Sequence, residues 1–152
     1  LSQSNQSLYH QDYYQWLLTT FKQLQNSDYS QVDWANLLEE LESLAKAQKR
    51  ELKSRLIVLI EHLLKLTYWE SERDDNARGW KNTIVEQRRQ IELLLEDSPS
   101  LQPLLADLFE SCYVRAKQDT SYKTGLPIEI FPQYPPFSFE QALKFDYFYN
   151  YD

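Results

Sequence analysis

The stretch RLIVLIEHLLKL, residues 55–66, decides the fold of this chain. Successive residues of a helix are about 100° apart, so apolar residues that recur every three or four positions lie on one face. The stretch contains most of such a row, called the seam below. The seam consists of Leu52, Leu56, Leu59, Leu63 and Leu66. Ile57, Ile60 and Leu64 widen it to more than half of the circumference. A surface helix carries a narrower stripe, so the pattern predicts a central helix with neighbours on two or more sides.

Length and composition indicate one helical domain over residues 1–152. The chain has only two glycines among 152 residues and is rich in Leu, Glu, Gln and Lys, which favours helices over sheets. Its net charge of −7 speaks against broad binding to nucleic acid or to an anionic membrane. The one cysteine, Cys112, fits a reducing, cytoplasmic environment and is interpreted as a small buried residue. The polar start LSQSNQS predicts no signal peptide, and we expect residues 1–6 to be mobile.

Two helices are expected before the central one. Ser7 is a candidate cap for a helix that continues to about Gln25, and Asp33 is a good cap for the next helix. The second helix has an expected inward face of Leu37, Leu38, Leu41 and Leu44. After Leu44, the last residue of this face, the next leucine in line is Leu52, eight positions later. A glutamine occupies the midpoint, where an apolar residue would continue the row. We therefore predict a kink or tight turn near residues 45–48.

Two further helices and a different kind of tail follow. The charged run 71–78 is predicted to be a loop, followed by a helix over about 80–96. Ser100 is a candidate cap for the last long helix, which continues to about Tyr122 and stops at Gly125. Residues 126–152, called the strap below, are rich in proline and aromatic residues and should run extended over the bundle. Within the strap, Ser138 and Gln141 fit a capping box for one short helix over about 139–144.

Several segments together resemble a known family. They are YHQDYYQWL (9–17), VDWANLLEELESL (32–44), the central stretch, GWKNTIVEQRRQIELLLEDSPSL (79–101), TGLPIEIFP and FSFEQAL. In this order and spacing they resemble a bacterial family catalogued as domain of unknown function 29, over about residues 9–148. The resemblance implies an all-helical domain and no established activity.

A few polar residues are candidates for a site. Glu40 lies on the flank of its apolar stripe, and Arg88 and Gln87 lie on or near the core face of another helix. A partly buried charge must be matched, so we expect a Glu40–Arg88 salt bridge with Gln87 hydrogen-bonded nearby. The catalytic alternative makes Glu40 a general base, assisted by His62 or Lys65, with Arg88 holding an anionic group.

Other kinds of site find less support. Glu61 and His62 are adjacent, which is the wrong spacing for a helical di-iron site, and no zinc or phosphate-loop motif occurs. We therefore expect no metal and no cofactor. Basic residues around Trp80 could contact nucleic acid, but the acidic total favours a solvated face.

These observations predict an all-α bundle of about five main helices with an extended strap. The function is unknown from sequence, and the preferred hypothesis is a non-catalytic protein-interaction or regulatory module that pairs with itself or another protein. One alternative is a small hydrolase or nuclease that uses Glu40, His62, Lys65 and Arg88. Another is a nucleic-acid-linked regulator, such as one half of a toxin–antitoxin pair. We expect neither a membrane nor nucleic acid as the partner.

Overall fold

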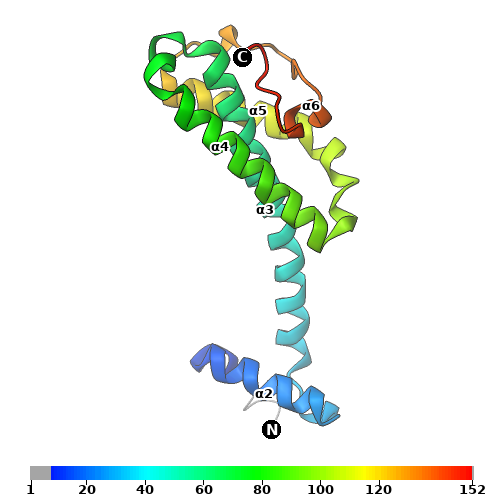
Figure 1. The fold of residues 1–152 in the computed structure, drawn as a ribbon. Coiled ribbons are helices and arrows are strands. Elements are labelled where there is room, and N and C mark those ends of the chain that lie inside the picture. Colours follow the sequence, from blue (N-terminus) through cyan, green and yellow to red (C-terminus); the bar gives the residue numbers. More distant parts are fainter. Residues whose placement is uncertain (1–7, 152) are drawn as a thin grey trace. The chain divides into compact units, whose positions relative to one another are not determined.

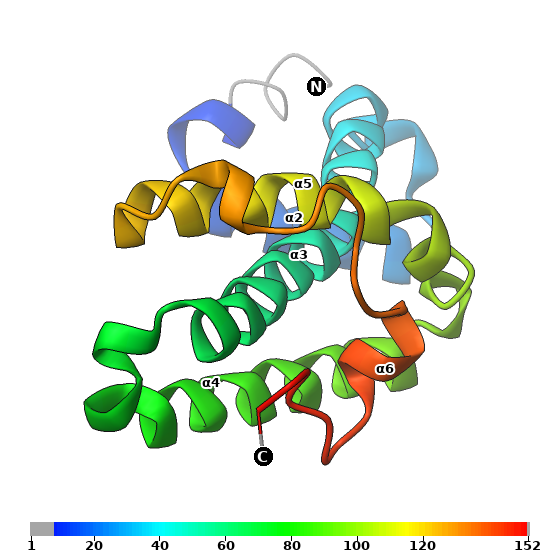
Figure 2. The same cartoon turned by 90° about the horizontal axis from the view of Figure 1, so that it is seen from above.

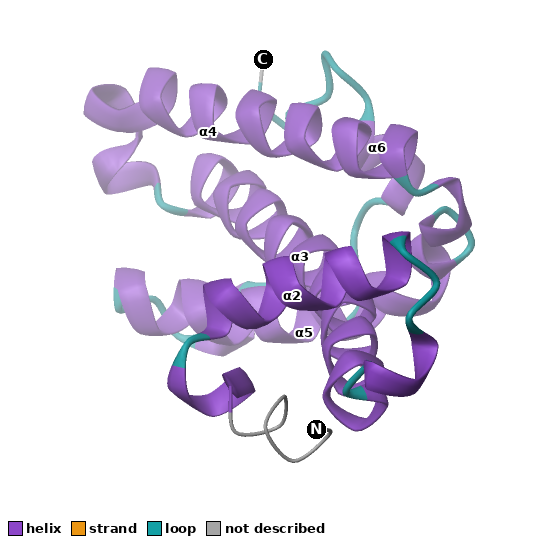
Figure 3. Cartoon of the chain, turned by 90° about the horizontal axis from the view of Figure 1, so that it is seen from below, coloured by secondary structure: helices purple, strands orange, loops and turns teal. Residues whose placement is uncertain are grey.

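The computed structural model describes residues 8–151 and confirms the all-α class. Helices make up 80% of it, and none of the described residues forms a strand (Figure 3). The chain divides into two compact units, unit 1 up to Ala47 and unit 2 from Gln48. A single domain over the whole chain stays a prediction. The expected mobile residues 1–6 and the cap Ser7 lie outside the described residues.

Unit 1 contains the short α2, Tyr13–Gln25, the 3-10 turn η1, Tyr29–Gln31, and the beginning of α3. The single helix expected up to Gln25 is wrong, because the chain breaks at Asp12 after the helical residues 8–11. The Asp12 carboxylate accepts a hydrogen bond from the Gln15 amide at 3.0 Å and so caps α2. Asp33 caps α3 in the predicted way, because its carboxylate accepts from the Asn36 amide at 3.3 Å.

Helix α3, Trp34–Tyr68, is continuous over 35 residues, so the predicted kink near residues 45–48 is wrong. The local sequence Ala-Lys-Ala-Gln-Lys has high helix propensity and contains neither glycine nor proline. The gap in the seam marks a change in packing instead. The expected inward leucines before the gap, Leu38, Leu41 and Leu44, are 63%, 54% and 61% exposed.

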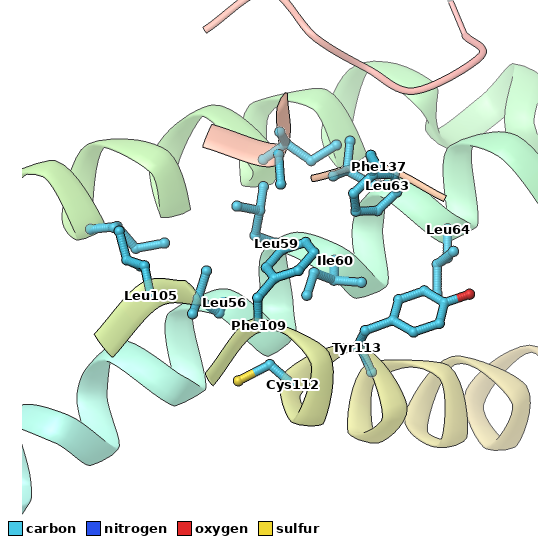
Figure 4. Close-up of a cluster of buried hydrophobic side chains, with 14 of the residues drawn as sticks. Leu56, Leu59, Ile60, Leu63, Leu64, Leu105, Phe109, Cys112, Tyr113 and Phe137 are labelled. Carbon is cyan, nitrogen blue, oxygen red and sulfur yellow. The ribbon is translucent and has the colours of Figure 1, made fainter. Parts of the chain in front are cut away.

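In unit 2, the part of α3 after residue 48 lies between α4, Glu70–Asp97, and α5, Leu104–Thr124 (Figures 1 and 2). All five residues of the predicted seam are fully buried, which confirms this stretch as the centre of the core. Figure 4 shows its side chains beside Phe109, Cys112 and Tyr113 of α5, with Phe137 of the strap in the same cluster. The expected buried Cys112 is also confirmed.

Helix α4 begins ten residues earlier than predicted, so residues 71–78 are helical and the expected loop is wrong. Trp69 alone separates α3 from α4. Glu70 and Glu72 lie in the first turn, where acidic side chains favour a helix because its N-terminus carries partial positive charge. Arg73 adds a hydrogen bond of 2.7 Å from Nη2 back to the Thr67 carbonyl.

The end of α5 follows the prediction and its start does not. Ser100 lies inside the 3-10 turn η2, Pro99–Leu101, and Pro103 precedes α5 without a side-chain cap. Gly125 ends α5 in the left-handed region with φ of 77°, as predicted. In the strap, a 3-10 turn η3, Ile128–Ile130, is followed by α6, Phe139–Leu143, which has the predicted capping box.

Candidate functional site

Arg88 is a buried charged residue of unit 2 with several hydrogen-bond partners. It is only 6% exposed, and it points from α4 into the strap. Its Nε donates to the Ala142 carbonyl at 2.8 Å, Nη1 donates to the Phe145 carbonyl at 3.0 Å, and Nη2 donates to the Tyr147 carbonyl. Burial lowers the pKa of the guanidinium to about 10, which leaves it charged at neutral pH. Arg88 therefore ties the strap to α4.

A ladder of cations and aromatic rings continues this attachment along α4. The Arg73 guanidinium lies 5.4 Å from the centre of the Tyr151 ring, and Lys81 lies 4.7 Å from that ring and 4.9 Å from the Phe148 ring. Arg88 lies 5.4 Å from the Phe148 ring. Sequence reasoning missed this ladder, although the spacing of eight and then seven residues places the three cations on one face of a helix.

Glu40, in unit 1, binds two tyrosines. The Tyr9 hydroxyl donates to Oε1 and the Tyr13 hydroxyl donates to Oε2 at 2.7 Å. These hydrogen bonds favour the charged carboxylate and lower the pKa of Glu40, while the same contact raises the pKa of Tyr9 to about 12. Glu40 and Arg88, which the sequence predicts as an ion pair, thus each have other partners within their own unit.

Gln87 also has a different role from the predicted one. Its side-chain oxygen accepts from Arg55 Nη1 of α3 at 3.3 Å, and Arg55 Nη2 lies 3.5 Å from the Glu51 carboxylate. The three residues form a polar link between α3 and α4. None of the hydrogen bonds described for Arg88 goes to Gln87.

His62 and Lys65 lie around the buried carboxylate of Glu61. Glu61 is buried and accepts a hydrogen bond of 2.9 Å from Lys123 of α5, and Lys65 Nζ lies at 3.4 Å. The His62 Nδ1 donates to the Val58 carbonyl at 2.8 Å, and burial lowers the pKa of His62, so the ring is neutral at neutral pH. The burial of Glu61 could not be predicted from its neighbours in the sequence, because the cation that contacts it most closely, Lys123, is 62 residues away.

A cavity of about 500 Å³ lies in unit 2 beside Arg88. Most of its wall is one face of α4, and the remaining wall comes from Gln102, Leu143 and Phe145. Of the four predicted catalytic candidates, Arg88 lines this cavity, and Glu40, His62 and Lys65 do not.

Two further features of the described residues bear on the predicted site types. Residues 8–151 contain no group of three or more His, Cys, Asp or Glu side chains placed to hold a metal ion. Within the same range, no helix is both long and apolar enough to cross a membrane.

The fold and these contacts define an all-α protein whose candidate polar residues are engaged in hydrogen bonds or ion pairs within each unit. The chain belongs to the family Domain of unknown function DUF29, whose model matches residues 8–148. No curated protein and no solved structure matches the chain.

Proposed function

We propose that this protein is a non-catalytic interaction module that pairs with a second copy of itself through the apolar surface of unit 1. The observation that carries the proposal is the exposure of the Leu38, Leu41 and Leu44 side chains, on adjacent turns of one helix. Soluble proteins seldom expose a contiguous apolar patch of this kind unless it meets a partner.

Helix α2 adds a second exposed apolar stripe to unit 1. Tyr14, Leu17, Leu18 and Phe21 have the spacing of one helix face, and their exposure ranges from 40% for Leu18 to 70% for Tyr14. In a globular domain this spacing identifies the side that faces the core. Within unit 1, the described residues leave this face uncovered.

Unit 1 also has a very small core of its own. Among its described apolar residues, only Trp16 and Val32 are buried. Unit 1 has 47 residues, which is little more than the size of about 40 residues below which disulfides, metals or association are usually needed for stability. Association would bury the exposed leucines and aromatic residues of unit 1, at about 25 cal/mol for each Å² removed from water.

The order of charges along α3 favours a second copy as the partner. Acidic residues 39, 40 and 42 precede basic residues 46, 49 and 50 on this helix. When two such helices pair in antiparallel orientation around a two-fold axis, the acidic part of each lies opposite the basic part of the other. The same apolar patch then meets itself, as a two-fold interface requires.

A matched pair of substitutions tests this function. Leu41→Glu places a charge in the α3 patch, whereas Leu93→Glu places the same charge on α4 at a leucine of similar exposure, 48%. In sedimentation equilibrium of the purified protein, we expect the wild type and Leu93→Glu to form dimers and Leu41→Glu to dissociate at least tenfold more readily. A monomeric wild type, or equal dissociation of both variants, would contradict the proposal.

The hydrolase or nuclease alternative requires Glu40, His62, Lys65 and Arg88 to act together. The structure engages Glu40 with tyrosines, His62 with a backbone carbonyl and Arg88 with three carbonyls. This alternative and the nucleic-acid-linked regulator stay predictions, and no described contact favours either of them.

A further inference from the structure

The cavity beside Arg88 has walls of two kinds. The α4 wall consists of residues that share one face of the helix over three turns. They are Val85, Arg88, Arg89, Ile91, Glu92, Leu95 and Glu96. The opposite wall includes Leu143 of α6 and Phe145 of the strap, so apolar side chains line both walls of the cavity.

The end of the cavity nearer the middle of α4 is positive. Arg88 has five N–H groups, and three hydrogen bonds to backbone carbonyls leave two N–H groups for another acceptor. Among the described ion pairs, none includes Arg88 or the exposed neighbouring Arg89. Asp146 acts on Arg88 at longer range, and its described ion-pair contact is with Lys144 at 3.9 Å. A buried guanidinium without a carboxylate in contact is a favourable place for an anionic group.

The other end of the cavity is negative. Glu92 and Glu96 follow Arg89 by about one and two turns of α4 and line the same cavity. With a rise of 1.5 Å per residue, Glu96 lies about 10 Å along the helix axis from Arg89. Among the described ion pairs, none includes Glu92 or Glu96. A cation is therefore favoured at this end.

We propose that this cavity binds a short apolar peptide with free termini, its carboxylate at Arg88 and Arg89 and its ammonium group at Glu92 and Glu96. An extended chain spans about 3.5 Å per residue, so three residues reach over the distance between the two charged ends. Apolar side chains would pack on Ile91, Leu95 and Leu143. The volume of about 500 Å³ is within the range of small-ligand sites. This inference does not depend on the pairing of two chains.

Trileucine and its two blocked forms test the proposal by titration calorimetry on the full chain. We expect free trileucine to bind, and we expect N-acetyl-trileucine and trileucine amide each to bind at least tenfold more weakly, because each lacks one charged end. Arg89→Gln should weaken free trileucine about tenfold and leave the binding of the amide unchanged. Glu96→Gln should weaken free trileucine similarly and leave the acetylated peptide unchanged.

Glu110→Gln, at an exposed position on α5, is the matched control and should leave every affinity unchanged. Near-ultraviolet circular dichroism shows whether each variant retains the wild-type packing. The proposal is overturned if free trileucine does not bind at millimolar concentration, or if the blocked peptides bind as tightly as the free one. Unchanged affinity in well-folded Arg89→Gln and Glu96→Gln would also overturn it.

Discussion

At the scale of single residues, Arg88 shows how a buried charge can serve the fold without an acidic partner in contact. Three strap carbonyls accept its hydrogen bonds and would otherwise lose their partners away from water. Arginine suits this position because its planar fork presents several donors in fixed directions, which a lysine ammonium group cannot reproduce.

Arg88→Met should therefore destabilise unit 2 by about 3 kcal/mol, because it leaves three carbonyls without their donor. Arg88→Lys keeps the charge and should recover only part of this loss. Urea unfolding measures both changes. The exposed Arg78→Met on the same helix is the control and should change the free energy of unfolding by less than about 0.5 kcal/mol. Equal effects at Arg78 and Arg88 would refute the role of Arg88 in holding the strap.

The hydrogen bonds to Glu40 should make the stability of unit 1 depend on pH. The hydrogen bonds from Tyr9 and Tyr13 hold the pKa of Glu40 below its ordinary value of 4.5. Their contribution to stability is therefore present above pH 4.5 and is lost as the pH falls through the lowered pKa. In the double variant Tyr9→Phe, Tyr13→Phe, the pKa of Glu40 should rise towards 4.5.

Carboxyl-carbon NMR titration measures that pKa directly. Tyr14→Phe removes a hydroxyl from a strongly exposed tyrosine with no described bond to Glu40, and it should leave the titration unchanged. If the Glu40 titration is the same in the wild type and the double variant, the two tyrosine hydrogen bonds do not stabilise the carboxylate.

At the scale of helices, the apolar seam was a reliable guide and the breaks between helices were not. The seam from Leu52 to Leu66 predicted the buried centre because its spacing reports burial directly. The gap between Leu44 and Leu52 also reports a change in burial, whereas our prediction from the sequence is a break in the backbone. Helix propensity, which is high at residues 45–49, decides the backbone there. The charged run 71–78 contains neither glycine nor proline, so no strong helix breaker interrupts α4 there.

The contacts of the candidate site could not be predicted because they join distant parts of the chain. The partners of Arg88 are carbonyls 54 to 59 positions away, and a backbone carbonyl gives no signal in a sequence. The partners of Glu40 are tyrosines that could equally have been core residues. The sequence was enough to predict that Arg88 is a constrained polar residue. It was not enough to predict which groups Arg88 contacts.

Alanine substitutions at the two glycines should change the stability of the protein in opposite directions. Gly79 lies inside α4 with open space around the position of a Cβ atom, so Gly79→Ala should stabilise the protein by about 0.5–1 kcal/mol. Gly125 has φ of 77°, which costs an alanine about 1–2 kcal/mol, so Gly125→Ala should destabilise it. Thermal unfolding of both variants checks the signs, and a stabilising Gly125→Ala would contradict the left-handed end of α5.

At the scale of the whole molecule, the two units use their apolar residues differently. In unit 2 the seam of α3, the inner face of α5 and the strap cover one another in one core. In unit 1, Leu38, Leu41 and Leu44 of α3 and the stripe of α2 are exposed. The sequence analysis predicts an interaction module without naming its surface, whereas in the structure strap residues such as Phe137 lie in the core and apolar side chains of unit 1 are exposed.

The most direct test of the pairing is the native mass spectrum of the purified wild-type protein at micromolar concentration. If unit 1 pairs two copies, we expect a species of twice the 18.2 kDa mass of one chain. A species with the mass of one chain at every concentration tested would contradict the claim that unit 1 pairs two copies of this protein.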